Sequence, residues 1–212
     1  MTRILRGTQS PTSELIFSLF PVVLKVPEYI RELPTPQLAK ALGVLARESV
    51  FFSARQADVT IGDFPKGNRG QPLPWCGVHW SLTHKPFYVA GVASFHPVGI
   101  DIEAVKPVPS RLFCRICSER EAGLFPGVPR EKVFFRCFTA KEAVLKLHGV
   151  GLSGLNDVSV VEVSGPLHLG LSYQGVFTRV EQFMMDGHLA SIAGIGTNVI
   201  WTSSCQSRYW GL

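Results

Sequence analysis

The chain has 212 residues, of which 46% are hydrophobic and 17% charged, and its formal net charge is +5. This composition excludes an intrinsically disordered protein, and the length allows one large domain or two lobes of about 100 residues each. The positive charge favours anionic partners, but the chain has no run of five or more basic residues, which excludes a polybasic nucleic-acid-binding tail.

The amino-terminal segment lacks the pattern of a targeting sequence. No long apolar region directly follows Arg3 and Arg6, which argues against a signal peptide. Residues 15–26 are apolar, but Pro21 and Lys25 interrupt them and the segment is too short to span a bilayer. We interpret it as a buried strand pair or a segment docked on the core, and we expect no membrane association.

The five cysteines are odd in number and lack the spacing of a disulfide framework, which favours reduced thiols in a cytoplasmic protein. Cys114 and Cys117 form a C-x-x-C pair. A zinc site would need a second pair or nearby histidines, and a redox motif would need a preceding strand at a helix amino terminus. Neither is evident, so structural thiols are favoured over metal or redox use.

The first half of the chain shows one long helical pattern followed by strands. Apolar side chains at i, i+3 and i+4 spacing predict a helix over 35–52, with Thr35 and Pro36 in its first turn. A strand at 57–61 and a loop rich in Gly, Pro and Asn at 63–74 follow. Alternating and β-branched residues then predict strands over 78–82, 87–94 and 98–102.

The second half repeats this combination. Short helices are predicted at 110–117 and 118–124, the second beginning with a capping box of Ser118 and Glu121. The longest helical pattern covers 129–148 and ends at glycines. Strands follow over 158–163, 167–171, 176–183 and 188–195.

The pattern therefore predicts an α+β fold of two similar, pseudo-symmetric lobes, each an antiparallel sheet packed with a main helix. We place the amino-terminal lobe at 1–100 and the carboxy-terminal lobe at 101–212. The seam between them lies near residues 95–107, and ligand clefts tend to form at such seams.

Acidic residues mark this seam. Asp101 and Glu103 are two apart on a predicted strand and so share a face, and Glu142 and Lys146 share a face of the long helix. Three carboxylates and an ammonium group that converge would suit a hard cation and a phosphate, as in phosphoryl transfer. Each pair also has a plain reading, as exposed acids at a strand end or a surface ion pair worth about 0.3–0.5 kcal/mol.

Three further candidates also keep two interpretations. Glu121 is either a helix-capping acid or a catalytic acid. His84, at a predicted strand end, is either an ordinary loop histidine or a phosphate donor. The segment 67–72 is a turn-rich connection whose glycine amides and Arg69 would also suit an anion.

The motifs of this sequence, in their order along the chain, resemble those of the 4′-phosphopantetheinyl transferase superfamily, in its two-lobed Sfp-type (surfactin-synthetase-activating) branch. The main motifs are Val98-Gly99-Ile100-Asp101-Ile102-Glu103 and Phe138-Thr139-Ala140-Lys141-Glu142-Ala143-Val144-Leu145-Lys146. Ser81-Leu82-Thr83-His84 and Gly70-Gln71-Pro72 are similar to a serine-histidine strand end and a glycine-lysine-proline loop of the family. The resemblance covers roughly residues 36–163.

The resemblance implies Mg²⁺-dependent transfer of the phosphopantetheine arm of coenzyme A to a serine of an acyl, peptidyl or aryl carrier protein, releasing adenosine 3′,5′-bisphosphate. The amino-terminal lobe would be the coenzyme A-binding half and the carboxy-terminal lobe the magnesium and catalytic half. Carriers of fatty-acid, polyketide or nonribosomal-peptide biosynthesis are the implied partners. The protein would be a cytoplasmic monomer that binds neither nucleic acid nor membrane.

Carried over residue by residue, the resemblance assigns the magnesium ligands, with Mn²⁺ as an alternative metal, to Asp101, Glu103 and Glu142. Glu142 or Glu121 would remove the serine proton, and Lys146 and Lys141 would neutralise phosphate charge, with Lys146 also counted as catalytic. The other coenzyme A contacts would come from Lys40, Arg69, Gly70, Gln71, Pro72, Thr83 and His84.

The chain departs from the family pattern at Gln71, where a lysine is common, and at Thr83, where serine is usual. Lys40 is assigned to the 3′-phosphate, with Arg31 and Arg69 as rivals. Two other functions stay open: a catalytically weak coenzyme A- or carrier-binding protein on the same scaffold, and a Mg²⁺-dependent nuclease.

Overall fold

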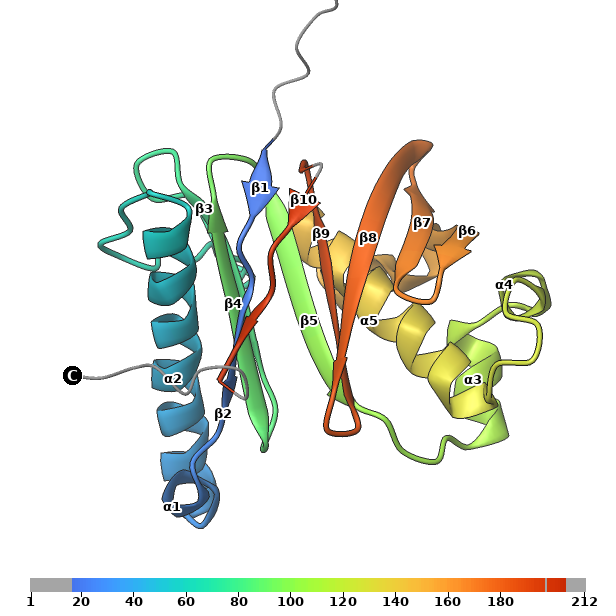
Figure 1. The fold of residues 1–212 in the computed structure, drawn as a ribbon, viewed down its shortest axis with the longest axis horizontal. Coiled ribbons are helices and arrows are strands. Elements are labelled where there is room, and N and C mark those ends of the chain that lie inside the picture. Colours follow the sequence, from blue (N-terminus) through green and yellow to red (C-terminus); the bar gives the residue numbers. More distant parts are fainter. Residues whose placement is uncertain (1–16, 197, 205–212) are drawn as a thin grey trace, which may run out of the picture.

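The computed structural model describes residues 17–196 and 198–204. Its first lobe is a four-stranded sheet in the order β11-β2-β4-β3, covered on one face by the long helix α2 (Figure 1). Strands β2, β4 and β3 pair antiparallel, whereas β11, near the other end of the chain, adds to β2 in parallel. The elements of this lobe are β2 (Val22–Lys25), α1 (Glu28–Arg31), α2 (Thr35–Gln56), β3 (His79–His84), β4 (Tyr88–Ser94) and β11 (Thr202–Ser203).

The second lobe is a five-stranded antiparallel sheet in the order β5-β9-β8-β7-β6, with helix α5 packed on one face. Its elements are β5 (Val98–Ala104), α3 (Ser110–Ile116), α4 (Glu119–Gly123), α5 (Arg130–His148), the 3₁₀ helix η1 (Leu152–Asp157), β6 (Val158–Gly165), β7 (His168–Tyr173), β8 (Val176–Met185) and β9 (His188–Gly194). A two-stranded parallel pair joins β1 (Ser18–Leu19) to β10 (Asn198–Val199). The prediction of an α+β fold with a main helix in each lobe is confirmed.

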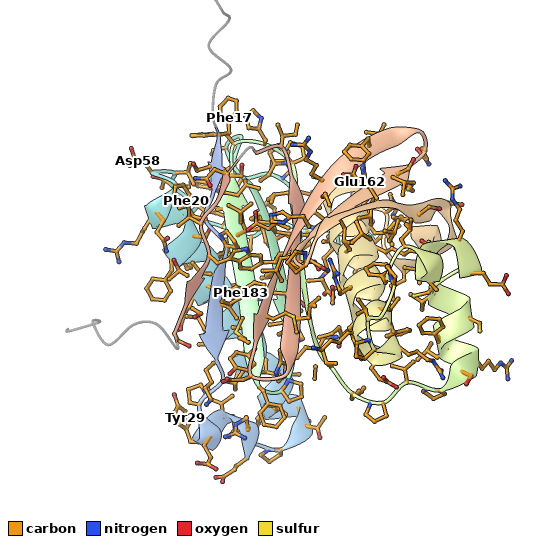
Figure 2. All side chains as sticks on the ribbon, turned by 45° about the vertical axis from the view of Figure 1, so that its right-hand side comes forward. Phe17, Phe20, Tyr29, Asp58, Glu162 and Phe183 are labelled. Atoms are coloured by element: carbon orange, nitrogen blue, oxygen red, sulfur yellow. The ribbon has the colours of Figure 1, made fainter. Side chains whose placement is uncertain are left out.

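The core lies in layers between these elements. Apolar side chains of α2 pack against the first sheet, and those of α5 pack against the second. Between the sheets lies a third cluster, to which β5 contributes Ile100 and Ile102. At its rim Phe183 of β8 (labelled in Figure 2) stacks on Trp201, with ring centroids 5.3 Å apart. Since side chains alternate along a strand, Asp101 and Glu103 project away from this inter-sheet core.

Several local predictions are refined. The apolar segment 17–26 forms β1 and β2, as expected, while positions 15 and 16 lie outside the described residues. The prediction of a strand at 57–61 is wrong: α2 continues to Gln56, and Val59 and Ile61 pack their side chains near Trp80 without joining a sheet. Helix α5 ends at Gly149, whose φ of 65° is the left-handed conformation that a glycine C-cap supplies.

Two features concern the cysteines and the hydropathy of the helices. Cys76, Cys114, Cys117 and Cys137 are free thiols, and Cys205 lies outside the described residues. In the described part of the chain, no helix combines the length and hydropathy that crossing a membrane would require.

Gly99 sets the distance between β5 and α5. A Cβ at this position would overlap the carbonyl oxygen of Ala143 and crowd the amide nitrogen of Leu147, both backbone atoms of α5. The strand therefore lies directly against the helix backbone. This close approach brings the next residues of β5 under the side chains of α5.

We expect Gly99→Ala to lower the free energy of unfolding by about 3 kcal/mol or more, because a helix backbone cannot shift to admit a methyl group. The measurement is urea unfolding. The matched control is Gly123→Ala in α4, where an added Cβ meets nothing within 4 Å; it is expected to be neutral or stabilising by up to about 1 kcal/mol. Equal stability of Gly99→Ala and wild type would contradict the close packing.

Candidate active site

Three acidic residues converge beside the seam. Asp101 and Glu103 come from β5 and Glu142 from α5, and one carboxylate oxygen of each lies within 4.8 Å of the others. Asp101 is 1% exposed, and Glu103 and Glu142 are partly buried. We refer to these three residues as the acid cluster.

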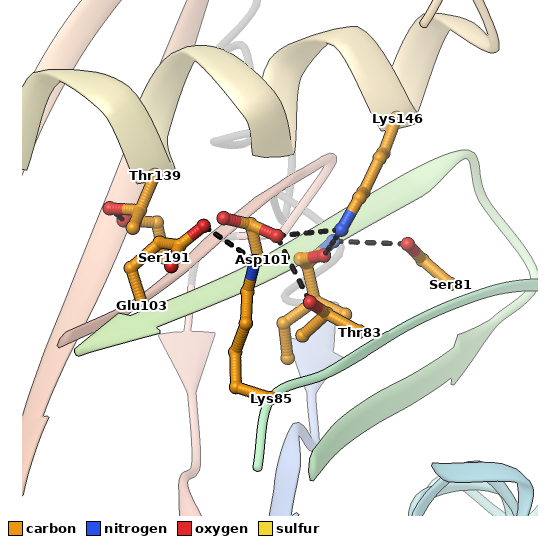
Figure 3. Close-up of polar contacts among 9 residues, drawn as sticks. Ser81, Thr83, Lys85, Asp101, Glu103, Thr139, Lys146 and Ser191 are labelled. Carbon is orange, nitrogen blue, oxygen red and sulfur yellow. Dashed lines mark hydrogen bonds and ion pairs between the residues drawn. The ribbon is translucent and has the colours of Figure 1, made fainter. Parts of the chain in front are cut away.

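Both lobes hold Asp101 in place. Its Oδ1 atom accepts a hydrogen bond from Lys146 Nζ of α5 at 2.7 Å and one from Thr83 Oγ1 of β3 at 3.0 Å (Figure 3). Lys146 also donates to the carbonyl of Ile100 at 2.9 Å, and Ser81 Oγ accepts from the Ile100 amide at 3.1 Å. The seam between the lobes is therefore fixed around this carboxylate.

The donor set fits a divalent cation. The second oxygen of Asp101, Oδ2, is buried and has no hydrogen-bond partner among the described residues. Burial first, and then the negative charge of Asp101, raise the pKa of Glu142 to about 7, which Lys146 and Lys85 only partly offset. A buried oxygen without a partner and a carboxylate that resists ionisation both indicate missing positive charge. Oxygen ligands of this kind suit Mg²⁺ or Mn²⁺.

Sequence reasoning missed Lys85, which follows His84 in the turn after β3. Its Nζ lies 2.6 Å from Glu103 Oε1 (Figure 3). Burial opposes its charge, but the hydrogen bond to Glu103 and the charges of the whole acid cluster together raise the pKa of Lys85. In the sequence, Lys85 could have been identified as a site residue through its position directly after the predicted His84.

Lys146, which binds Asp101, also lines a cleft along the seam. Two adjoining cavities of about 270 and 320 Å³ lie between the 66–74 loop and the carboxy-terminal end of α5. The predicted residues Arg69, Gln71 and Pro72 line both cavities, and so does Lys146; Gly70 lines the first. Gln71, which replaces the common lysine, closes the loop by accepting a hydrogen bond from the Arg69 amide at 3.1 Å.

His84 lies at the end of β3, where positive charge gathers. Partial burial, followed by the charges of Lys146, Lys85 and Lys66, lowers the pKa of His84. Lys66, a second residue that sequence reasoning missed, also lines the first cavity. A histidine among three lysines marks a place suited to an anion.

Glu121 and Lys141, predicted as site residues, form a separate buried ion pair with 2.8 Å between Glu121 Oε1 and Lys141 Nζ. Glu121 also accepts from the amides of Ser118 and Val160, each at 2.8 Å, and Lys141 donates to the Ile116 carbonyl at 2.7 Å. Within the described residues, neither side chain has a recorded contact with the acid cluster. The pair joins α3, α4, α5 and β6.

The candidates for the 3′-phosphate lie on different elements. Lys40 lines a hollow on α2 together with Tyr29 and Glu48, and within the described part of the chain no recorded contact links it to the acid cluster. Arg31 pairs with Glu28 at 3.8 Å and lies over the Phe87 ring. Of the three candidates, Arg69 alone lines the seam cleft.

We expect Glu121→Gln to act on stability and not on turnover. Removing one partner of a buried ion pair costs about 3–5 kcal/mol, because the other charge is left uncompensated. Thermal unfolding should show this loss, and Glu121→Gln combined with Lys141→Met should recover part of it. At a temperature where the variant is folded, a hundredfold fall in turnover would instead identify Glu121 as a catalytic base.

Comparisons with known proteins match the region of the chain that contains the acid cluster. The family model of the 4′-phosphopantetheinyl transferase superfamily matches residues 97–182, which contain the whole acid cluster. The 4′-phosphopantetheinyl transferase psf-1 of Bacillus pumilus is 37% identical over 78 residues, covering 35% of this chain and 34% of the relative. The gsp transferase of Aneurinibacillus migulanus is 30% identical over 92 residues, covering 42% and 39%.

A longer match joins the chain to a putative 4′-phosphopantetheinyl transferase, slr0495, of Synechocystis, at 30% identity over 130 residues, or 56% of this chain and 50% of the relative. The matched regions thus span half or less of these relatives. The resemblance expected from the two sequence motifs, including that to the two-lobed branch, is confirmed. The chain is thus similar to 4′-phosphopantetheinyl transferases over the region that carries the acid cluster.

Proposed function

We propose that this protein transfers the 4′-phosphopantetheine arm of coenzyme A to a serine of a carrier protein, with Mg²⁺ or Mn²⁺, releasing adenosine 3′,5′-bisphosphate. The observation that carries the proposal is the acid cluster, with its unpartnered Asp101 oxygen, joined through Lys146 to a cleft lined by cations. In this proposal, residues 1–100 mainly bind coenzyme A and residues 101–212 mainly hold the metal and the catalytic groups. The protein would act as a cytoplasmic monomer.

The proposed reaction breaks one phosphorus–oxygen bond and forms another. The carrier serine oxygen attacks the phosphate that bears the pantetheine arm, and the bond to the adenosine bisphosphate breaks. Asp101, Glu103 and Glu142 would hold the metal, which when bound supplies positive charge to the pyrophosphate oxygens. Lys146, fixed by Asp101 and the Ile100 carbonyl, would stabilise charge that develops on the transferred phosphate.

The serine proton needs an acceptor. Glu142 belongs to the acid cluster, beside which the reacting phosphate would lie. Glu121 lies in the capping and ion-pair network described above. We therefore assign proton removal to Glu142, directly or through a water molecule.

The cleft residues would bind the rest of coenzyme A. Arg69, Gly70, Gln71 and Pro72 would contact its adenosine end from the 66–74 loop. Thr83 would act by orienting Asp101, and His84 would contact a phosphate. Lys40, on α2, would contact the 3′-phosphate of coenzyme A.

We expect coenzyme A to bind more tightly as the pH falls from 8 to 6. The pKa of His84 is lowered in the free protein, and a bound phosphate would raise it, so binding takes up a proton. The gain is present below the pKa of the free histidine and is lost as the pH rises through the pKa in the complex. Calorimetry in EDTA should show a several-fold change that is reduced in His84→Gln. His168→Gln, on β7, is the control, and an identical pH dependence in His84→Gln would contradict the assignment.

The activity is tested by intact-mass analysis of several apo carrier proteins incubated with the protein, coenzyme A and Mg²⁺, with EDTA as a control. We expect a metal-dependent gain of one phosphopantetheine arm on the carrier serine. Coenzyme A binding without transfer to any carrier would favour a binding protein. Salt-sensitive DNA binding, without transfer and without coenzyme A binding, would favour a nuclease.

A further inference from the structure

Lys85 gives the acid cluster a second internal cation besides Lys146. Its Nζ lies 2.6 Å from Glu103 Oε1, and Asp101 and Glu142 attract the same charge. The side chain is 34% exposed and reaches the cluster from the short turn between β3 and β4. The Lys85 amide donates to the Tyr88 carbonyl at 2.8 Å, so the backbone of this turn is anchored while the long side chain remains free to change partner.

The charges of the site favour a metal more strongly when an anion binds with it. With all groups ionised, three carboxylates and two ammonium groups leave a net charge of −1. A divalent cation added alone would turn this into +1, while the ammonium group of Lys85 already holds Oε1, one of the two oxygens that Glu103 offers a metal. An incoming pyrophosphate would restore the balance and offer Lys85 a new partner.

We infer that Lys85 is an internal counter-ion that a divalent metal must displace from Glu103, and that coenzyme A assists by drawing Lys85 onto its phosphates. The inference rests on the proposed function, which supplies the phosphate anion. It makes metal and coenzyme A bind cooperatively, each raising the affinity for the other by the same factor. The charges of Lys146, Lys85 and Lys66 all act on His84, the neighbour of Lys85 in the chain, so this lysine lies among other cations.

The test is Mn²⁺ binding by the full chain, followed through the electron paramagnetic resonance signal of free Mn²⁺, with and without coenzyme A. Without coenzyme A, Lys85→Met should bind Mn²⁺ about tenfold more tightly than wild type or better, because a unit charge close to the metal has been removed. The factor by which coenzyme A raises Mn²⁺ affinity should fall. Lys85→Arg, which keeps the charge, should behave like wild type.

Lys106→Met is the matched control, since Lys106 is exposed just beyond β5 and the described residues record no ion pair for it. It should leave Mn²⁺ affinity within about twofold, as expected for a screened surface charge. Unchanged Mn²⁺ affinity in Lys85→Met, or no Mn²⁺ binding by either protein without coenzyme A, would overturn the inference. Transfer by the wild-type protein, measured separately by intact mass, reports on the proposed function alone.

Discussion

Replacing Asp101 with asparagine is expected to lower phosphopantetheine transfer by at least about 10³-fold. Asparagine keeps the size of the side chain and an oxygen that accepts from Thr83 and Lys146, so the local packing is retained. It removes the negative charge and replaces Oδ2, the buried oxygen without a partner, by an amide that cannot bind a metal. Turnover on an apo carrier, measured at saturating Mg²⁺, gives the effect.

A second readout separates loss of metal binding from loss of structure. Mg²⁺ with coenzyme A should raise the midpoint of thermal unfolding of the wild type, because a ligand that binds the folded state stabilises it, and should not do so for Asp101→Asn. Glu162→Gln, an exposed acid on β6 outside the acid cluster, should match the wild type in both measurements. Wild-type turnover in Asp101→Asn would exclude Asp101 as a metal ligand.

Glu142→Gln is expected to abolish transfer and yet stabilise the metal-free protein at alkaline pH. Burial and Asp101 raise the pKa of Glu142 from its ordinary value of 4.5 to about 7 in the folded state. Protonation of Glu142 therefore stabilises the fold, fully below pH 4.5, and this contribution is lost as the pH rises through about 7. At pH 8 the ionised group costs on the order of 3 kcal/mol, which glutamine would relieve.

Urea unfolding in EDTA at pH 5 and pH 8 measures this effect. The gain in the free energy of unfolding should be small at pH 5 and reach on the order of 3 kcal/mol at pH 8. Glu48→Gln, an exposed glutamate in the middle of α2, should change little at either pH. Equal gains at both pH values, or a loss of stability at pH 8, would show that Glu142 is not held among uncompensated negative charges.

The strongest predictions from sequence depended on spacing within one element. The two-residue spacing of Asp101 and Glu103 indicated a shared strand face, and the four-residue spacing of Glu142 and Lys146 indicated a shared helix face. Gly99, inside the same motif, then lets the two elements approach closely enough for the three acids to meet. Local periodicity thus predicted the arrangement of the acid cluster in some detail.

What sequence did not predict depends on contacts between elements. Lys85 lies in a turn, and its partner Glu103 is determined by how the two lobes pack. Glu121 and Lys141 carry charges typical of a site, but the burial of one face of α5 makes them partners of each other. The two-residue strands β10 and β11 pair with β1 and β2 from the opposite end of the chain, where no local pattern indicates a strand.

The most direct test is a crystal structure of the protein with coenzyme A and Mn²⁺, in which an anomalous difference map locates the metal. The account predicts a peak at bonding distance from one oxygen each of Asp101, Glu103 and Glu142, with the pyrophosphate of coenzyme A completing the coordination. Coenzyme A bound in the seam cleft without a metal peak at these residues, or a peak elsewhere, would contradict it.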